Sequence, residues 1–481
     1  MGEAQSTLFA LDFNRSIHVE ARPERLTGDA GSVLLREVFS RLDLDRFFEE
    51  RLIDPRRPEL ILHPQIELLR TEVLLLAQGW QDQDDADRLR QDPALRLAVS
   101  QRCGVAPLQT PPETARVPEG LASQPTLSRL AATLSTEQQR RVLREGLLKA
   151  AARRLRATRG RRLRHATLDV DSLPVEVYGT QAGSAYNGYY GVRCYHPLVA
   201  AVGETGDLLD VRLREGNAHT ADGALEFVLP LLDRMEREFC QVASVRMDAG
   251  FPEDELLSAL EQRQVGYVAR LRSNSRLAEL AAPLLRAFQP EQLQICFHEL
   301  SYQAESWSCA RRVVLVLQQE PGELFAHSFF LLTNWSAEDQ PPVALLALYR
   351  QRGTAEGHLG ELMNVLEPAL SSTRRAKSHY RGESPKRRYA SRDPFATNEV
   401  KLLLNALAYN LVHAVRILME KVTGEGWGLK RVVERLLKVP ARLLLHSWRV
   451  LLILNPAIAG LWATLWSALG RWRWLPPPSP A

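Results

Sequence analysis

Apolar residues along the chain change their spacing near His165. Before that point they recur at intervals of three and four, which predicts helices over residues 27–52, 63–80 and 124–157. We therefore expect a mostly helical region over residues 1–160. After it, short runs rich in β-branched and aromatic residues alternate with helical spacing, which is typical of a sheet with helices packed on it.

The region after His165 has a defined order of elements. Strands are expected at residues 165–173, 186–203 and 208–217, a helix at 221–238, a strand at 242–251, a helix at 252–264 and a strand at 266–274. This order, β-β-β-α-β-α-β, is a three-stranded meander followed by parallel additions. It is the order of the ribonuclease H-like fold, so we predict an α/β (mixed α+β) protein with a ribonuclease H-like mixed sheet and helices on both faces.

The second half contains more β-rich sequence and two long helices. Residues 297–319 and 327–335 are rich in strand formers, so a β-rich insertion is expected, with a separate small unit as one arrangement. Helical spacing returns over residues 343–366 and 397–422. The expected divisions are a helical N-terminal region (1–160), the first part of the core (161–275), the β-rich insertion (276–335), the second part of the core (336–440) and a C-terminal strand, helix and proline-rich tail (441–481).

The composition is typical of a soluble globular protein. Of 481 residues, 45% are hydrophobic and 25% are charged, and the five cysteines form no CxxC pair and no Cys/His zinc spacing. The N-terminus lacks a signal-peptide pattern, so we expect a cytoplasmic protein. The apolar run 450–470 is long enough to span a bilayer, but Asn455 and Pro456 interrupt it, which favours a docked terminal helix and no membrane partner.

Positive charge is concentrated in two stretches, although the formal net charge is only +4. Residues 140–164 and 374–392 are rich in arginine and lysine, a distribution that suits nucleic-acid phosphates. A solvated helix face or loop is the alternative interpretation of each stretch. Trp307 is a candidate for stacking on a base, with core packing as its alternative. The candidate DNA-binding residues are Arg153, Arg154, Arg161, Arg162, Arg374, Arg375, Lys377, Lys386, Arg387, Arg388 and Trp307.

Two carboxylates lie close together on the first strand of the predicted sheet. Asp169 and Asp171 are two positions apart, so they point to the same side of the strand, about 7 Å from each other. Like charges in this arrangement are unfavourable unless water, a cation or a basic group offsets them. Asp248 ends the fourth strand, which is expected to pair beside the first. The sequence therefore predicts an acidic site where these two strands end.

A further carboxylate lies on the helix predicted at residues 343–366. Tyr349, Arg352 and Glu356 are spaced three and four apart, so they share one helix face. Two aspartates from neighbouring strands and a glutamate from a helix supply the oxygen ligands that divalent cations prefer. Two Mg²⁺ ions (or Mn²⁺) in such a site activate the attacking oxygen and stabilise the leaving oxygen of a phosphodiester. They also offset the clustered negative charge on the first strand.

Seven motifs occur in an order that resembles a known family. They are GWQDQDDADRLRQDPAL, LASQPTLSRL, TLDVDS, YNGYYG, RMDAGF, YRQRGTAEGHLGEL and NEVKLLLNALAYNL. With these motifs the chain resembles, over nearly its whole length, the DDE transposases of bacterial insertion sequences, specifically the insertion-sequence-1380 group. A single short motif of this kind is a weak signal, but the order of all seven together with the strand context is a strong one.

The resemblance implies a role for each residue of the acidic site. The family's first aspartate falls on Asp171, the second on Asp248 and the glutamate on Glu356, which form the expected catalytic and metal-binding triad. Tyr349 and Arg352 match two further members of the tyrosine-arginine-glutamate-lysine signature of related transposases. Arg352 is expected to hold a phosphate by bidentate hydrogen bonds.

Two assignments stay open at this point. Asp169 is an additional candidate metal ligand and the alternative first acid of the triad. The lysine that the signature places seven residues after the glutamate is Met363 in this chain. His358, Lys377 or an arginine of residues 374–392 is then the candidate for that phosphate contact.

The resemblance also implies a reaction and its partners. A cut-and-paste transposase cleaves the ends of its insertion sequence with a divalent metal, and the freed 3′-hydroxyl then attacks target DNA. The expected partners are the terminal inverted repeats of its own element and target DNA, with residues 1–160 as a DNA-binding region. Two element ends need two active sites, so a homodimer is expected in the synaptic complex. The expected location is the cytoplasm, in association with the nucleoid.

Three other functions are compatible with parts of the sequence. The stretch LDVDSL matches the opening motif of aspartyl-nucleophile phosphatases, in which Asp169 would be the nucleophile. A ribonuclease H-like nuclease without strand transfer would use the same three acids. A DNA-binding derivative without catalysis is the remaining alternative, although the presence of all three acids argues against it.

Overall fold

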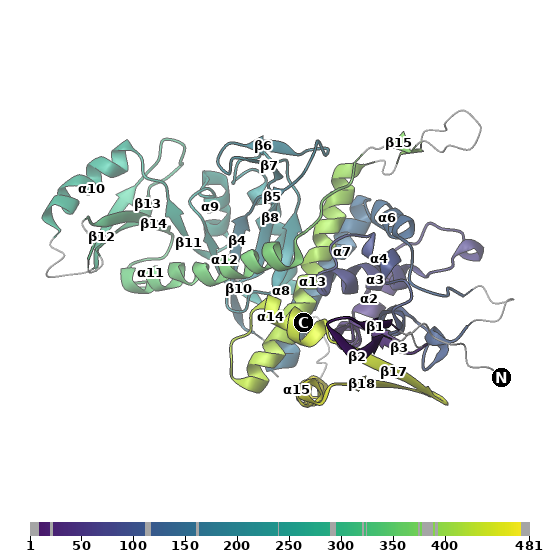
Figure 1. Ribbon diagram of the computed structural model, residues 1–481. Coiled ribbons are helices and arrows are strands. Elements are labelled where there is room, and N and C mark those ends of the chain that lie inside the picture. Colours follow the sequence, from purple (N-terminus) through teal and green to yellow (C-terminus); the bar gives the residue numbers. More distant parts are fainter. Residues whose placement is uncertain are drawn as a thin grey trace, which may run out of the picture.

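An eight-stranded mixed sheet forms the centre of the protein (Figure 1). The computed structural model describes residues 9–19, 23–110, 117–159, 163–238, 240–288, 295–319, 322–323, 325–373, 376–377, 388–389 and 393–472. The order of strands across the sheet is β12-β13-β14-β11-β10-β4-β8-β9. Their bounds are β4 (His165–Ser172), β8 (Leu198–Val202), β9 (Leu208–Arg212), β10 (Gln241–Met247), β11 (Gly266–Leu271), β12 (Ile295–Tyr302), β13 (Arg311–Gln318) and β14 (His327–Thr333).

One part of this sheet has the predicted connectivity. β4, β8 and β9 form an antiparallel meander, while β10 and then β11 add in parallel on the other side of β4. Parallel neighbours need a crossover connection, and the helices α8 (Ala224–Glu238) and α9 (Asp254–Gln262) provide it. The protein is therefore a mixed α/β protein with a large mixed sheet, and β4 is an interior strand of that sheet.

The strand predicted over residues 186–203 is divided into three. β6 (Ala185–Asn187) and β7 (Val192–Tyr195) join β5 (Val175–Glu176) in a small separate sheet, and only β8 belongs to the large one. Pro197 separates β7 from β8, because proline has no N–H to donate to a strand ladder. The small sheet follows β4 directly in the chain.

The β-rich residues after 295 extend the large sheet and do not form a sheet of their own. β14 pairs antiparallel with β11, from Thr333 opposite Val268 to Phe330 opposite Leu271, and β13 and β12 continue outward. Without this pairing β11 would be an open edge with unpaired backbone N–H and C=O groups. The helix α10 (Ser275–Ala287) connects β11 to the added strands.

Alternation along β4 divides its side chains between the two faces of the sheet. Leu168 and Val170 lie in a hydrophobic cluster with residues of α8 and α9. Asp169 and Asp171 therefore point to the opposite face. The helices α11 (Pro342–Arg350) and α12 (Arg352–Glu361) cover that face, followed by the π-helix η3 (Leu362–Leu366). The strand period thus places both carboxylates under the helix that carries Glu356.

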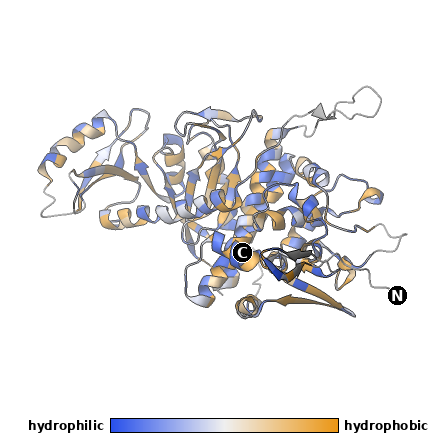
Figure 2. Ribbon diagram, in the orientation of Figure 1, coloured by the Kyte–Doolittle hydropathy of each residue, from blue (hydrophilic) through white to orange (hydrophobic). Residues whose placement is uncertain are grey.

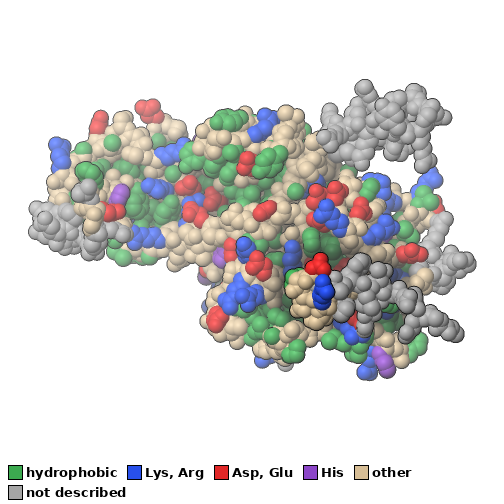
Figure 3. All heavy atoms as spheres, in the orientation of Figure 1, with side chains coloured by type: hydrophobic (Ala, Val, Ile, Leu, Met, Phe, Trp, Pro, Cys, Tyr) green, Lys and Arg blue, Asp and Glu red, His purple; other side chains and the backbone are tan. Residues whose placement is uncertain are grey.

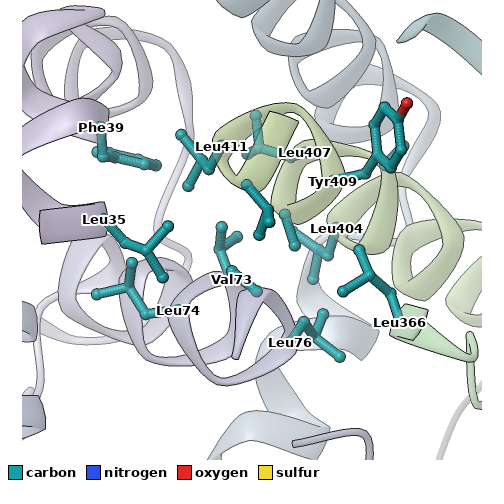
Figure 4. Packing of buried hydrophobic residues seen from close by; sticks show 14 of the residues in the cluster. Leu35, Phe39, Val73, Leu74, Leu76, Leu366, Leu404, Leu407, Tyr409 and Leu411 are labelled. Atoms are coloured by element: carbon teal, nitrogen blue, oxygen red, sulfur yellow. The ribbon is translucent and has the colours of Figure 1, made fainter. Parts of the chain in front are cut away.

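The N-terminal region is mainly helical and packs around one long helix, α13 (Pro394–Thr423). Leu404, Leu407 and Leu411 of α13 lie against Val73 and Leu74 in the core of this region (Figure 4). The helices are α1 (Gly31–Arg41), α2 (Leu44–Arg51), α3 (Gln65–Ala77), α4 (Asp85–Arg88), α5 (Pro93–Val99), α6 (Gln124–Thr133) and α7 (Glu137–Arg159). Shorter elements are β1 (Phe9–Leu11), β2 (Asn14–Val19), β3 (Arg25–Thr27), η1 (Pro58–Leu60) and η2 (Ala106–Leu108).

The helix α13 joins the helical region to the sheet. Its start is capped by Asp393, whose side chain accepts from the Ala396 N–H, and it ends at Gly424, which has a φ of 71°. The helix is long and apolar enough to cross a membrane, but it is buried in the protein along nearly its whole length. The helix is therefore part of the core of this protein. Hydrophobic residues also gather in the inner strands and the C-terminal hairpin (Figure 2).

The C-terminal elements lie beside the N-terminal strands. β17 (Ala441–His446) and β18 (Arg449–Leu454) form a hairpin, and β3 pairs with β17. The helix α15 (Pro456–Gly470) follows, and Asn455 caps it by accepting from the Ala457 N–H. The apolar run 450–470 is therefore a strand and a docked helix. The remaining short elements are α14 (Leu429–Val432), η4 (Val433–Leu437), β15 (Ala376–Lys377) and β16 (Arg388–Tyr389).

Candidate active site

The three acids of the predicted triad come from three separate elements. Asp171 lies near the carboxyl end of β4, and its side chain is 20% exposed. Asp248 follows the last residue of the neighbouring β10, and Glu356 lies in α12. Their side chains are 47% and 54% exposed. The site therefore has one largely buried carboxylate and two that solvent reaches.

Arg352 brings these acids together. Its Nη2 donates to Asp171 Oδ2 at 2.7 Å, and its Nη1 lies 3.9 Å from Asp248 Oδ1. Its Nη1 also donates to Glu356 Oε1, one helical turn further along α12. Three carboxylates that are distant in the sequence thus meet around one guanidinium group.

Burial and charge shift the pKa values in this site. Burial, opposed by Arg352 and aided by Asp248 and Glu356, raises the pKa of Asp171 to about 6. Burial lowers the pKa of Arg352, but the three surrounding acids outweigh it and raise that pKa above its ordinary value. A carboxyl group with a pKa this high lacks enough positive charge to offset its desolvation. Additional positive charge in the site would therefore be energetically favourable.

Asp169 has a different environment from Asp171. Its Oδ1 and Oδ2 accept from Nε and Nη2 of Arg246 at 2.5 and 2.6 Å, and both side chains are buried. Burial raises the pKa of Asp169 above its ordinary value, although Arg246 lowers it. Arg246 Nη1 also donates to the Leu348 carbonyl of α11 at 2.9 Å. Asp169 therefore ties the sheet to the helix above it, while Asp171 is the aspartate of β4 that reaches the other acids.

Arg246 is the partner that fixes Asp169, and in the sequence it stands out only as the first residue of the motif RMDAGF, quoted above for the family resemblance. It lies directly opposite Asp169 in the parallel pairing of β10 with β4. This register depends on a crossover through α8, so no local pattern reveals it. The two aspartates of β4 are therefore offset by two different arginines, because Asp169 pairs with Arg246 and Asp171 pairs with Arg352.

The other residues of the signature are placed near the site or in the core. Tyr349 lies in α11 and is half buried, and burial raises its pKa. His358 Nδ1 lies 3.0 Å from Nη2 of Arg416, which also pairs with Glu361, so this histidine belongs to an internal network. Met363 packs against the hydrophobic core. Neither His358 nor Met363 therefore presents a group to the acidic site.

The donor chemistry of the site suits a hard divalent cation. Asp171, Asp248 and Glu356 offer carboxylate oxygens, which are the ligands that Mg²⁺ and Mn²⁺ prefer. In the described part of the chain, no three acidic, histidine or cysteine side chains lie close enough to hold one ion. The guanidinium of Arg352 stands among the three acids. The acids can therefore surround a cation only after Arg352 has moved away from them.

Two arginines proposed for DNA contact point into the protein. Arg153 Nη1 donates to the carbonyls of Leu42 and Asp43 at 2.6 and 2.8 Å. Arg154 forms a buried bidentate ion pair with Asp207. A buried guanidinium with these partners is not available to a DNA phosphate. We therefore remove Arg153 and Arg154 from the proposed DNA-binding set.

Trp307 is also a core residue and not an accessible stacking platform. It is only 5% exposed, its ring meets Tyr302 edge-on at 5.7 Å, and Arg311 lies over it at 5.2 Å. A base would have to displace these contacts to stack on it. The alternative of core packing therefore holds for Trp307.

The remaining basic candidates lie outside the described residues, wholly or in their side chains. Arg161, Arg162, Arg374, Arg375, Lys386 and Arg387 fall outside the described ranges. Of Lys377 and Arg388, only the backbone is described, in β15 and β16. On the face shown in Figure 3, the acidic and basic side chains of the described residues are interspersed.

A pair of tyrosines beside the site was not singled out as functional by the sequence analysis. Tyr189 and Tyr190 follow β6, are 89% and 37% exposed, and have ring centroids 4.9 Å apart. Burial, with the charges of Asp171 and Asp248, raises the pKa of Tyr190, so its hydroxyl lies within electrostatic reach of the acids. The motif YNGYYG, quoted above only for the family resemblance, was the available signal.

The comparison of the whole sequence with protein families decides the family. A family model described as transposase DDE domain group 1 matches residues 9–381. The chain belongs to the DDE transposases. As a DDE transposase it is a polynucleotidyl transferase of DNA transposition, a class of enzymes that generally uses divalent metals.

Similarity to proteins of known structure is weak. Among solved structures, the cryo-EM structure of the piggyBac transposase synaptic complex with hairpin DNA is similar, with 13% sequence identity and a TM-score of 0.43. The match covers 84% of this chain and 78% of that chain. Among curated proteins, no sequence matches this transposase. The assignment to the family rests on the family model alone.

Proposed function

We propose that this DDE transposase moves an insertion sequence of the insertion-sequence-1380 group by a cut-and-paste reaction. The observation that carries the proposal is the meeting of Asp171, Asp248 and Glu356 around Arg352. The seven ordered motifs support the assignment to the group. The strand order β9-β8-β4-β10-β11 within the large sheet supports a ribonuclease H-like core.

Each side chain of the site has a proposed task. Asp171, Asp248 and Glu356 would hold two Mg²⁺ (or Mn²⁺) ions, which when bound lower the pKa of the attacking oxygen and stabilise the leaving oxygen. Arg352 neutralises the acids before DNA arrives. Once it leaves them, its planar guanidinium offers two parallel N–H groups to a phosphate. Tyr349, half buried in α11, supports the helix beside it.

Asp169 has a positioning role in this proposal and is not a metal ligand. Both of its oxygens accept from Arg246, which leaves neither of them directed at the other acids. The same geometry disfavours the phosphatase alternative, because a nucleophilic aspartate needs a free oxygen in contact with its substrate. The family match likewise favours a transposase over a nuclease that lacks strand transfer.

The partners in this proposal are the terminal inverted repeats of the element and target DNA. Residues 1–160 and the basic residues of 374–392 would contact them, and the basic residues of 374–392 would replace the lysine that is absent at Met363. Two element ends require two active sites, so the synaptic complex would contain a homodimer. The protein would act in the cytoplasm, on the nucleoid.

The test uses DNA that carries the inverted repeats flanking the gene, with and without Mg²⁺. The parent protein should cleave the ends and join their 3′-hydroxyls to a target duplex. Asp171→Ala, Asp248→Ala and Glu356→Ala should each abolish both steps while DNA binding persists. Asp233→Ala is the matched control, because that exposed acid lies away from the site, on α8.

Three outcomes would contradict parts of the proposal. Near-normal cleavage by one of the three variants would remove that residue from the triad. Cleavage without joining to target DNA would indicate a nuclease. A covalent phospho-aspartate on Asp169 in a single turnover would indicate the phosphatase reaction.

A further inference from the structure

An arginine ends the strand next to the two that carry the aspartates of the site. The strands β4, β10 and β11 are parallel neighbours, so their carboxyl ends meet at one edge of the sheet (Figure 1). The last row of residues paired across all three strands is Val170, Met247 and Ala269. One residue further along each strand stand Asp171, Asp248 and Arg270. Neighbouring strands are about 4.8 Å apart, so the backbone of Arg270 lies roughly 10 Å from that of Asp171.

The side chains of this row share one face of the sheet. The three residues of the preceding row all lie in the hydrophobic cluster that includes α8 and α9. The residues that follow them therefore point to the opposite face, which α11 and α12 cover. In β11, Val268 lies two residues before Arg270 and belongs to a cluster with Leu345 of α11, which agrees with this assignment. Arg270 is therefore beside the acids in the sheet, whereas Arg352 approaches them from the helix.

The guanidinium of Arg270 is not used by the described part of the protein. Arg270 is exposed, and its Cζ lies 5.4 Å from the centroid of the Phe329 ring on β14. Its side chain forms no ion pair or hydrogen bond with the described residues, and Asp248 pairs with Arg352 at 3.9 Å. An aromatic ring holds a guanidinium by its face and leaves the N–H groups at its edge free to donate. Arg270 is therefore a positioned cation whose N–H groups can bind an acceptor from solution.

Electrostatic contacts link Arg270 to the acidic site as well. Burial raises the pKa of Tyr349, Asp248 raises it further, and Arg352 and Arg270 both lower it. Tyr349 thus lies within electrostatic reach of both arginines and of Asp248. The position of Arg270 at the site is therefore supported by the strand register and by its neighbours on α11.

A DNA phosphate is the acceptor that this position fits. Three carboxylates repel a DNA strand, so phosphates that lie near them are stabilised by positive charge beside the acids. An arginine offers a planar fork that matches two phosphate oxygens. Bases along one DNA strand are about 3.4 Å apart, so the roughly 10 Å between Asp171 and Arg270 corresponds to about three nucleotides.

We propose that Arg270 binds a backbone phosphate that lies within about three nucleotides of the phosphate at which the acids act. The strand that carries this phosphate is the end of the element or the target DNA, which present the same chemistry. The inference rests on the proposed function for the position of the DNA, but its test measures binding and needs no cleavage.

The experiment measures DNA binding by the full-length protein without divalent metal, by fluorescence anisotropy. The probe is a branched DNA in which the 3′ end of the element is already joined to target DNA, so both strands have a fixed position. In a series of probes, one phosphate at a time near the joint is replaced by an uncharged methylphosphonate. At one position, this replacement should weaken binding by the parent protein roughly three- to tenfold. It should not weaken binding by Arg270→Gln, because that variant has already lost the contact.

The position of the sensitive phosphate assigns the strand. Sensitivity in the element strand or in the target strand, lost in Arg270→Gln, identifies which of the two Arg270 contacts. Arg270→Gln should also make the salt dependence of binding shallower by about 0.9 units of slope. Arg263→Gln is the matched control, because Arg263 is an exposed arginine before the opposite end of β11, where it pairs with Asp233. This control should keep the sensitivity of the parent at every position.

A conservative variant keeps the test decisive if Arg270→Gln impairs folding. Arg270→Lys keeps the charge but loses the planar fork, so methylphosphonate at the sensitive position should weaken its binding less than that of the parent. If each variant of Arg270 that folds loses as much affinity as the parent at every substituted position of both strands, the proposal is overturned. Arg270 is then a solvated arginine that contacts no phosphate.

The outcomes also separate this inference from the proposed function. If the parent cleaves and joins inverted-repeat DNA with Mg²⁺ but Arg270→Gln keeps the sensitivity of the parent, the phosphate contact is wrong and the transposase proposal stands. If Arg270→Gln loses that sensitivity but the parent never cleaves with Mg²⁺, the proposed reaction fails while the phosphate contact remains.

Discussion

Replacing Arg246 with methionine is expected to destabilise the protein and to release the sheet from α11, the helix that precedes the one carrying Glu356. Arg246 is fully buried, pairs with both oxygens of Asp169 and donates to the Leu348 carbonyl. Methionine fills a similar space but removes every one of these donors. Asp169 would then be a buried carboxylate without a counter-ion.

The magnitude follows from the burial of both partners. Removing one member of a buried ion pair costs about 3–5 kcal/mol, because the charge that remains is uncompensated. Protonation of Asp169 limits the loss, since burial already raises its pKa and the loss of Arg246 raises it further. An acid with a raised folded-state pKa contributes stability below its unfolded pKa and loses it as the pH rises. The deficit of the variant should therefore shrink, by up to about 1.4 kcal/mol per pH unit, as the pH falls from the folded-state pKa of Asp169 in the variant to its folded-state pKa in the parent protein.

The assay is urea unfolding followed by tryptophan fluorescence at several pH values. Arg263→Met is the matched control, because its ion pair with Asp233 is exposed on both sides and such pairs contribute at most about 1 kcal/mol. The double variant Arg246→Met with Asp169→Leu should recover most of the loss, since no buried charge remains. If Arg246→Met lowers the free energy of unfolding no more than the control does, the claim that this ion pair ties the sheet to the helix above it is refuted.

Three further predictions test other parts of the account. Cleavage at limiting Mg²⁺ should fall as the pH is lowered through about 6, because Asp171 has this pKa and must be ionised to bind metal; a pH–rate profile that stays flat well below that value contradicts this. Trp307→Ala should lower the free energy of unfolding by about 3–5 kcal/mol in urea titrations and leave DNA affinity unchanged, whereas a stable variant with weak DNA binding would restore its stacking role. Replacing Lys386, Arg387 and Arg388 with alanine should make the salt dependence of DNA binding shallower by about one unit of slope per lost phosphate contact, and an unchanged slope would show that these charges do not contact DNA.

The order of the strands and the acids they carry could be predicted because the signals are local or follow from connectivity. Period-two alternation identified β4, β10 and β11, and the parallel crossover rules placed Asp248 beside Asp171. The helical spacing of Arg352 and Glu356 then defined one face. Chain order and periodicity together were therefore sufficient to propose an acidic site with Asp248 and Glu356, and the family resemblance selected Asp171 over Asp169.

Pairings between distant segments could not be predicted in the same way. Nothing in the sequence around Asp169 names Arg246, and helical spacing shows that Arg154 lies on a face without showing that Asp207 covers it. The strands β12 to β14 have the same local pattern whether they form their own sheet or extend another one. Only the open edge of β11 decides between these arrangements, and it appears once the sheet is built.

The most direct test of the central claim replaces Asp171 with cysteine and compares Mg²⁺ with Mn²⁺ in the cleavage reaction. A thiolate is a soft ligand that Mg²⁺ binds poorly and Mn²⁺ tolerates better. If Asp171 holds the catalytic metal, Asp171→Cys should be inactive with Mg²⁺ and regain measurable cleavage with Mn²⁺. Asp169→Cys, which loses the buried pair with Arg246, should show no such recovery. Cleavage by Asp171→Cys at the rate of the parent protein in Mg²⁺ would contradict the account.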